Sequence, residues 1–413
     1  MDFQTPIEDL WSRRAERRKP YSGIGFDLEG LIRRQHNCAP FDLSLTLPDS
    51  RPSAAQIEAS RQFLRDQLVI PKSLGFPSDA KIISRRETPA YFVEEIEFTV
   101  TPPLRAPATV VIPKNGQRRH PSVITLHSMG GLRAYGREKL LASPGEPAFL
   151  TEYRQRNYSG RSLQEELAHR GYLSITIDAF NFGMRSAAAA IDPAAFLKNR
   201  LGFSADESGA FSDHAGSTEE PAALRGLSIA GLSIAALVAT DDIRSVDYLC
   251  SRDDVDTSRI GCAGLSFGSF RANYLSALDE RIKAAVSVCW LSTLNGIIDY
   301  NILGAMGFFA LPPALFRRMD ITDIAALSAP KPFLAISGWR DQLMQPCGIA
   351  EAHLRLRKHW KTLSAGTRFG SLIYDVGHEY NQKMQEASFD FFDHHLPKES
   401  QRHADLPLAE AYA

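Results

Sequence analysis

The segment Gly264-Leu-Ser-Phe-Gly268 places a serine between two glycines, where a short apolar run gives way to a helical pattern. In this G-x-S-x-G setting a sharp turn lifts the hydroxyl out at the carboxyl end of a sheet, and the glycines let strand and helix approach closely. Because a serine hydroxyl is a poor nucleophile at neutral pH, the site also needs a base and a carboxylate that orients it. We interpret Ser266 as a nucleophile for acyl transfer, with a tight structural turn as the alternative.

Candidates for the carboxylate and the base follow Ser266 along the chain. Asp341 comes after the apolar run PFLAISG, and His378 follows SLIYDVG and precedes the last helical pattern. The chain order expected for this kind of turn is Ser, then Asp or Glu, then His. We therefore predict a triad of Ser266, Asp341 and His378. Asp375 is a weaker competitor, because so close to His378 it would struggle to reach around the imidazole.

Acyl transfer also creates an oxyanion, which needs backbone N–H donors already in place. One donor is expected from Phe267, directly after the nucleophile, and the other from the segment LHSMGG. In that segment His127 can brace the loop, and the two glycines permit unusual dihedral angles. Met129 is our choice for the second N–H donor and Ser128 the alternative; a glycine-rich turn without a catalytic part is the plainer interpretation.

These residues must be positioned by strands that end on one rim of a sheet. Continuous apolar runs such as SVITL, LSITI and AAVSV are typical of strands buried on both faces of a parallel sheet. The alternation of such runs with amphipathic stretches predicts an α/β fold, with a mostly parallel sheet covered by helices and an antiparallel edge. We predict strands over 91–100, 108–112, 122–127, 173–178, 259–263, 284–289, 333–337 and 371–375. Helices are expected over 54–68, 162–170, 235–249, 267–278, 348–359 and 381–394.

The length of 413 residues permits more than one domain. The catalytic candidates nevertheless extend from His127 to His378 and must share one sheet. We therefore predict one catalytic domain over 88–397, preceded by a helical N-terminal cap over 1–87 and followed by a tail over 398–413.

Two segments of the catalytic domain, 185–234 and 290–325, are longer than ordinary connections of about 2–6 residues. We expect them to form lids or pocket walls. The candidates for substrate-pocket residues are His127, Trp290, Phe308, Phe309 and Trp339.

Composition excludes several classes of partner. The 47 Lys and Arg balance 48 Asp and Glu, so nucleic acid is not expected to bind. No uncharged stretch reaches the about 20 residues that cross a membrane, and the charged N-terminus lacks the apolar run of a secretory signal. Five scattered cysteines without metal-ligand spacing predict reduced thiols, a cytoplasmic location and no metal.

With these segments placed, the chain resembles the α/β-hydrolase superfamily, and within it the bacterial serine hydrolases of the dienelactone-hydrolase and acetylxylan-esterase type. The resemblance covers about residues 88–397 and rests on LHSMGG followed by YGREKL, on RIGCAGLSFGSFRANYLSALDERIKAAVSVCW, on SGWRDQLM and on VGHEYNQKMQEASFDFFDHHL. It implies the triad named above and hydrolysis of an ester or related acyl compound without a cofactor.

The expected function is hydrolysis of an ester or lactone of a small or medium apolar or aromatic substrate through an acyl-enzyme. Three alternatives stay open: a C–C bond hydrolase acting on a diketone-like compound, an acyltransferase, and an inactive hydrolase-fold binding protein. The expected partner is a small-molecule substrate, and a homodimer formed through the N-terminal cap also stays open.

Overall fold

The computed structural model describes residues 28–47, 51–69, 75, 79–186, 223–301, 307, 312 and 314–396. The chain divides into two units, Met1–Pro40 and Phe41–Ala413. The described part of the first unit contains helix α2 (Leu28–Asn37), which has no buried side chain. The sheet and all the predicted site residues belong to the second unit.

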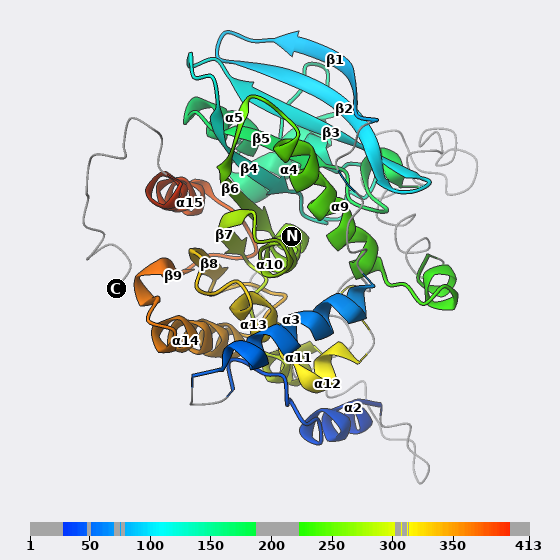
Figure 1. The fold of residues 1–413 in the computed structure, drawn as a ribbon, viewed down its shortest axis with the longest axis vertical. Helices are drawn as coiled ribbons and strands as arrows, with labels where there is room; N and C mark the ends of the chain where they lie inside the picture. The colour runs from blue at the N-terminus through cyan, green and yellow to red at the C-terminus, as the bar shows by residue number, and fades with distance from the viewer. Residues whose placement is uncertain are drawn as a thin grey trace, which may run out of the picture. The chain divides into compact units, whose positions relative to one another are not determined.

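A nine-stranded sheet runs through the described part of the second unit in the order β1-β2-β3-β5-β4-β6-β7-β8-β9 (Figure 1). Strands β1, β2, β3 and β5 pair antiparallel in succession, whereas every pair from β5 to β9 is parallel. The predicted mostly parallel sheet with an antiparallel edge is confirmed. The strands are β1 (Lys81–Glu87), β2 (Tyr91–Thr101), β3 (Leu104–Pro113), β4 (His120–Leu126), β5 (Leu173–Ile177), β6 (Val255–Leu265), β7 (Ile282–Val288), β8 (Phe333–Gly338) and β9 (Phe369–Tyr374).

Helices cover both faces of the sheet. Val123 and Ile124, neighbours on β4, belong to two different clusters of buried apolar side chains, because successive side chains of a strand point to opposite faces. The Val123 cluster includes side chains from α4 (Ala148–Tyr158), α5 (Leu163–His169) and α15 (Gln382–His395). The Ile124 cluster includes side chains from α3 (Ala54–Leu68), α9 (Ile234–Cys250), α10 (Phe267–Leu278), α11 (Leu294–Asn301), α12 (Leu315–Arg318), α13 (Ile321–Ala326) and α14 (Pro346–Thr362).

The segment before the sheet is attached to the core of the second unit. Leu64 and Leu68 of α3 are fully buried in the same cluster as α9 and α10. The backbone N–H groups of Leu45 and Thr46 both donate to Asp323 Oδ1 at 2.9 Å. The division after Pro40 therefore differs from the boundary that the sequence suggested at residue 87, because α3 and β1 join the packing and pairing of the sheet.

The two inserts differ in how much of them the structure describes. In the first, residues 187–222 lie outside the described residues, whereas the second contains α11, α12 and α13. Among the described helices no single one is long and apolar enough to span a membrane. The stretch Ala223–Ile229 and α9 reach the required length and apolar character only when taken together, and a 90° bend separates them.

Candidate active site

Ser266 lies at the junction of a buried strand and a buried helix. Strand β6 ends at Leu265 and α10 begins at Phe267, and Ser266 between them has φ 59° and ψ −116°. A positive φ is strained for a residue with a side chain, and such strain is concentrated at functional sites. The Ser266 N–H donates to the Val288 carbonyl at 2.8 Å, which ties the turn to the end of β7. The predicted strand–turn–helix setting of the serine is confirmed.

The two glycines around Ser266 are required by close backbone contacts. A Cβ atom on Gly268 would overlap the carbonyl oxygen of Leu126, and one on Gly264 would overlap the backbone of Gly268. The first turn of α10 thus lies directly against the end of β4, where the predicted oxyanion loop begins.

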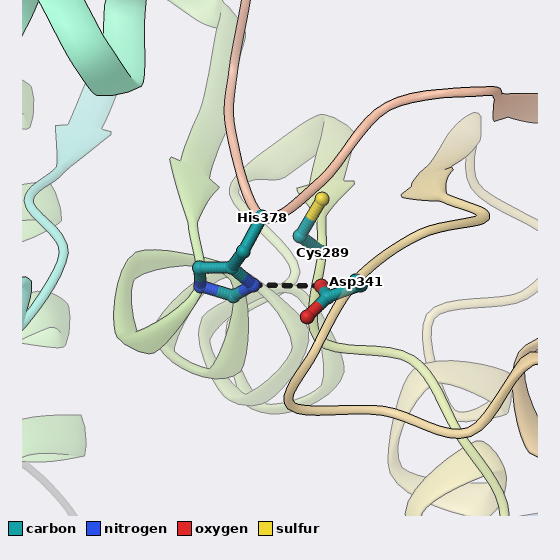
Figure 2. A group of neighbouring side chains, drawn as sticks. All are labelled: Cys289, Asp341 and His378. Atoms are coloured by element: carbon teal, nitrogen blue, oxygen red, sulfur yellow. Dashed lines mark hydrogen bonds and ion pairs between the residues drawn. The ribbon is translucent and has the colours of Figure 1, made fainter. Parts of the chain in front are cut away.

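Asp341 and His378 are brought together by two neighbouring parallel strands. Asp341 follows β8, His378 follows β9, and His378 Nδ1 lies 2.7 Å from Asp341 Oδ2 (Figure 2). An ionised carboxylate can only accept, so Nδ1 carries the proton and Nε2 is left as the basic nitrogen. The Asp341 side chain is buried and that of His378 is 23% exposed.

Backbone hydrogen bonds hold the loops of these two residues together. The Trp339 N–H donates to the Tyr374 carbonyl at 2.7 Å, and the Arg340 N–H donates to the Val376 carbonyl at 2.9 Å. The competing carboxylate, Asp375, points elsewhere: its side chain is 78% exposed and pairs with Arg340 at 2.8 Å. The structure thus brings Asp341, and not Asp375, to the imidazole of His378.

Cys289, for which the sequence predicts only a reduced thiol, lies beside this pair. Cys289 follows β7 at φ 53°, and its Sγ donates to the Glu379 carbonyl at 3.5 Å. The side chains of Cys289, Asp341 and His378 lie together (Figure 2), with one potential ligand atom of each within 4.8 Å of the others. The place of Cys289 at the end of a predicted strand could have indicated this.

These three side chains are of types that bind metal ions, and within the described residues they form one such group. Burial raises the pKa of the Cys289 thiol to about 12, so the protonated form prevails at neutral pH, whereas a metal needs the thiolate. The Asp341 oxygen and the His378 nitrogen are already hydrogen-bonded to each other. The arrangement fits a hydrogen-bonded acid–base pair better than a metal centre.

The loop that is predicted to supply an oxyanion donor contains left-handed glycines and a buried histidine. Gly130 and Gly131 have φ of 54° and 73°, the left-handed region that glycine favours. The His127 ring is fully buried, with Nδ1 3.1 Å from the Ser128 carbonyl oxygen and Nε2 3.2 Å from the Ala179 nitrogen. Burial, the largest cause, and the positive charges of nearby side chains hold the pKa of His127 well below its usual value. His127 is therefore a neutral brace of the loop.

Phe267 and Met129, the predicted N–H donors, lie on the two segments that meet at Gly268. Phe267 is the first residue of α10, where backbone N–H groups have no partner within the helix. None of the described residues accepts a hydrogen bond from the Met129 N–H. The Ser128 side chain instead points to a buried tyrosine pair, bonding Tyr153 and lying 3.4 Å from the Tyr158 hydroxyl.

The remaining pocket candidates are placed differently from one another. Trp290 is only 6% exposed and packs edge-on against Phe270, so it belongs mainly to the core. Trp339, two residues before Asp341, is 44% exposed. Phe308 and Phe309 lie outside the described residues.

Comparison with known proteins gives relatives in both sequence and structure, although no family model matches the chain. The chain is 27% identical over 273 residues to "Putative hydrolase YtaP" of Bacillus subtilis, a match that covers 66% of this chain and 78% of that protein.

Among solved structures, one described as a "putative acetyl xylan esterase" from Bacteroides fragilis aligns with a TM-score of 0.66 and 17% identity, covering 90% of this chain and 86% of the other. A glucuronoyl esterase from Solibacter usitatus aligns with a TM-score of 0.54 and 16% identity, covering 83% and 94%. Together with the sheet topology, these likenesses show the α/β-hydrolase fold.

Proposed function

We propose that this chain is a serine hydrolase that cleaves carboxylic esters or lactones, with Ser266 as nucleophile, His378 as base and Asp341 as its orienting carboxylate. The observation that carries the proposal is the hydrogen bond from His378 Nδ1 to the buried Asp341, at the carboxyl ends of strands β8 and β9. Strand β6 of the same sheet ends at the strained Ser266. The relatives described as hydrolase and esterases support the same reaction.

In the proposed mechanism the Ser266 hydroxyl attacks the substrate carbonyl while His378 Nε2 takes its proton. The N–H groups of Phe267 and Met129 hold the oxyanion of the tetrahedral intermediate. As the intermediate collapses, the imidazolium protonates the departing alcohol, and Ser266 keeps the acyl group. Water, activated by the same imidazole, then releases the acid and restores the serine.

The exposed apolar side chains beside Asp341 favour an apolar or aromatic substrate of small or medium size. Trp339 and Leu343 flank Asp341 in its loop and are 44% and 40% exposed. Large exposed apolar side chains in the loop of the proposed triad carboxylate suit an apolar acyl or alkoxyl group better than a charged one. The esterases among the structural relatives are described by carbohydrate names, so acetylated sugars belong in the test.

A substrate screen tests this proposal. p-Nitrophenyl esters of graded acyl length, aryl lactones and acetylated sugars would be offered to the wild type, to Ser266→Ala and to Ser258→Ala, which removes a hydroxyl at the other end of β6. We expect hydrolysis by the wild type and Ser258→Ala, and a loss of roughly three or more orders of magnitude in kcat for Ser266→Ala. Equal activity of all three proteins would overturn the proposal.

A further inference from the structure

Lys139 is a buried cation behind the oxyanion loop, at the end of the short helical turn η1 (Arg137–Lys139). Its side chain has no exposed surface, and its Nζ donates to the carbonyl oxygens of Ser128 at 3.0 Å and Met129 at 2.7 Å. The ammonium also lies 5.7 Å from the ring centre of Tyr153 and 5.3 Å from that of Phe182. Removing an ammonium from water is costly, so its placement against this loop needs a reason beyond packing.

The Lys139 contacts determine which way one peptide of the loop faces. The Ser128 carbonyl oxygen also lies 3.1 Å from His127 Nδ1, so two donors converge on it. In a trans peptide the C=O and the following N–H point in opposite directions. Because Lys139 and His127 lie on the carbonyl side, the Met129 N–H is directed away from them and is left without an acceptor among the described residues.

The turn that carries Lys139 is itself fixed to the sheet. The Arg137 N–H donates to Asp178 Oδ1 at 2.8 Å, and the Arg137 guanidinium pairs with the same carboxylate, which directly follows β5. Arg154 of α4 donates to the Glu138 carbonyl at 3.0 Å. The ammonium therefore has a rigid base from which to hold the loop.

We propose that Lys139 is a positioning residue of the oxyanion hole: it fixes the Ser128–Met129 peptide so that the Met129 N–H is held ready for the oxyanion. Its positive charge also favours the negative oxygen that develops in the transition state. This inference rests on the proposed function, in which the Met129 N–H is one of the two donors.

The test compares Lys139→Met with Lys331→Met in the full-length chain. Lys331 is a matched control, because its partly buried ammonium also donates to backbone carbonyls, those of Ser276 and Asp279 around the end of α10. Circular dichroism and thermal melting would show that each variant is folded. Lys139→Gln is the second variant and serves if Lys139→Met does not fold, since its amide can still donate a hydrogen bond to the loop.

A positioning role predicts a loss in the transition state rather than in substrate binding. We expect Lys139→Met to lower kcat by at least about tenfold with KM changed less than about twofold, and Lys139→Gln to be intermediate. The affinity for phenylboronic acid, which forms a tetrahedral adduct with the serine, should fall by a similar factor. Lys331→Met should lower the melting temperature while leaving kcat and the boronate affinity near wild type.

Three results would overturn the inference: a folded Lys139 variant with wild-type kcat, a loss confined to KM, or a lower kcat with unchanged boronate affinity. Failure of the proposed function can be distinguished from failure of this inference. It would show as equal activity of the wild type and Ser266→Ala, which is measured before any Lys139 variant.

Discussion

Asp341 gives the clearest prediction at the scale of single residues, because its carboxylate holds His378 in one tautomer at 2.7 Å. Asp341→Asn is expected to lower kcat by roughly four orders of magnitude with the fold intact, since an amide that donates to the ring favours the wrong tautomer. Steady-state kinetics at neutral pH on an ester from the screen would measure this. Asp375→Asn is the control, because that carboxylate is 78% exposed; similar losses in both variants would argue against the assignment.

Cys289 allows the acid–base pair to be distinguished from a metal centre. Its protonated thiol contacts the Glu379 carbonyl and takes no part in the proposed chemistry. We expect Cys289→Ala to keep kcat within about threefold of wild type, and its activity to be insensitive to added zinc or to a chelator. Two results together would contradict this expectation: loss of activity in Cys289→Ala, and a loss of wild-type activity on chelation that added zinc reverses.

The triad candidates could be predicted because each follows an apolar run at the carboxyl end of a strand. The role of Lys139 could not be predicted, since a lysine in a short turn has no local sequence pattern that reveals its neighbours. Lys139 meets the loop at Ser128 and Met129 only because η1 folds back onto Asp178, a contact that depends on where β5 ends. His127 and Trp290 are predicted pocket residues that the structure buries almost completely, at 0% and 6% exposure.

At the scale of elements, the eight predicted strands all form, and α3 and α10 have the predicted bounds. Strand β1 was missed. Its sequence KIISRRE is exposed on nearly every residue and has no alternating apolar pattern. It becomes a strand by pairing with β2, supported by Arg85, which lies 4.4 Å from the ring centre of Phe92. Helix α4 was likewise missed, since its apolar residues do not gather on one side.

The junction of β4, β6 and α10 is the element-scale feature on which the nucleophile depends. Gly268→Ala would push a methyl group into the Leu126 carbonyl, so we expect a loss of about 3 kcal/mol or more in the free energy of unfolding, together with a loss of activity. Urea unfolding followed by circular dichroism would measure the first effect. Gly366→Ala is the control, because the nearest atom to its new methyl group lies at 3.8 Å. Two variants of equal stability would show that the close approach is not required.

At the scale of the whole molecule, His353 couples stability to pH. It lies on α14 and contacts two neighbouring strands, with Nε2 2.9 Å from the Ser337 hydroxyl of β8 and Nδ1 2.8 Å from the Ser371 hydroxyl of β9. Burial, with a smaller effect of the Arg357 charge, lowers the pKa of His353 from 6.5 to about 4. Between these values the unfolded chain binds a proton that the folded protein does not, so stability falls as the pH drops below about 6.5.

We expect His353 to account for about 2 kcal/mol of the stability lost between pH 7.5 and pH 5. Urea unfolding of the wild type and His353→Gln at both pH values would show a smaller loss in the variant. His169→Gln, which alters a side chain that is 51% exposed, should lose as much as the wild type. An identical pH dependence of His353→Gln and wild type would contradict the assignment of a depressed pKa.

The catalytic assignment belongs to the whole molecule as well, because the sheet must bring the ends of β6, β8 and β9 to one rim. Its most direct test is labelling with a fluorophosphonate probe, followed by peptide mass spectrometry. The proposed mechanism predicts one adduct on Ser266, absent from Ser266→Ala and formed much more slowly in His378→Ala. An unlabelled wild type, or an adduct on any other residue, would contradict the claim that Ser266 is the activated nucleophile.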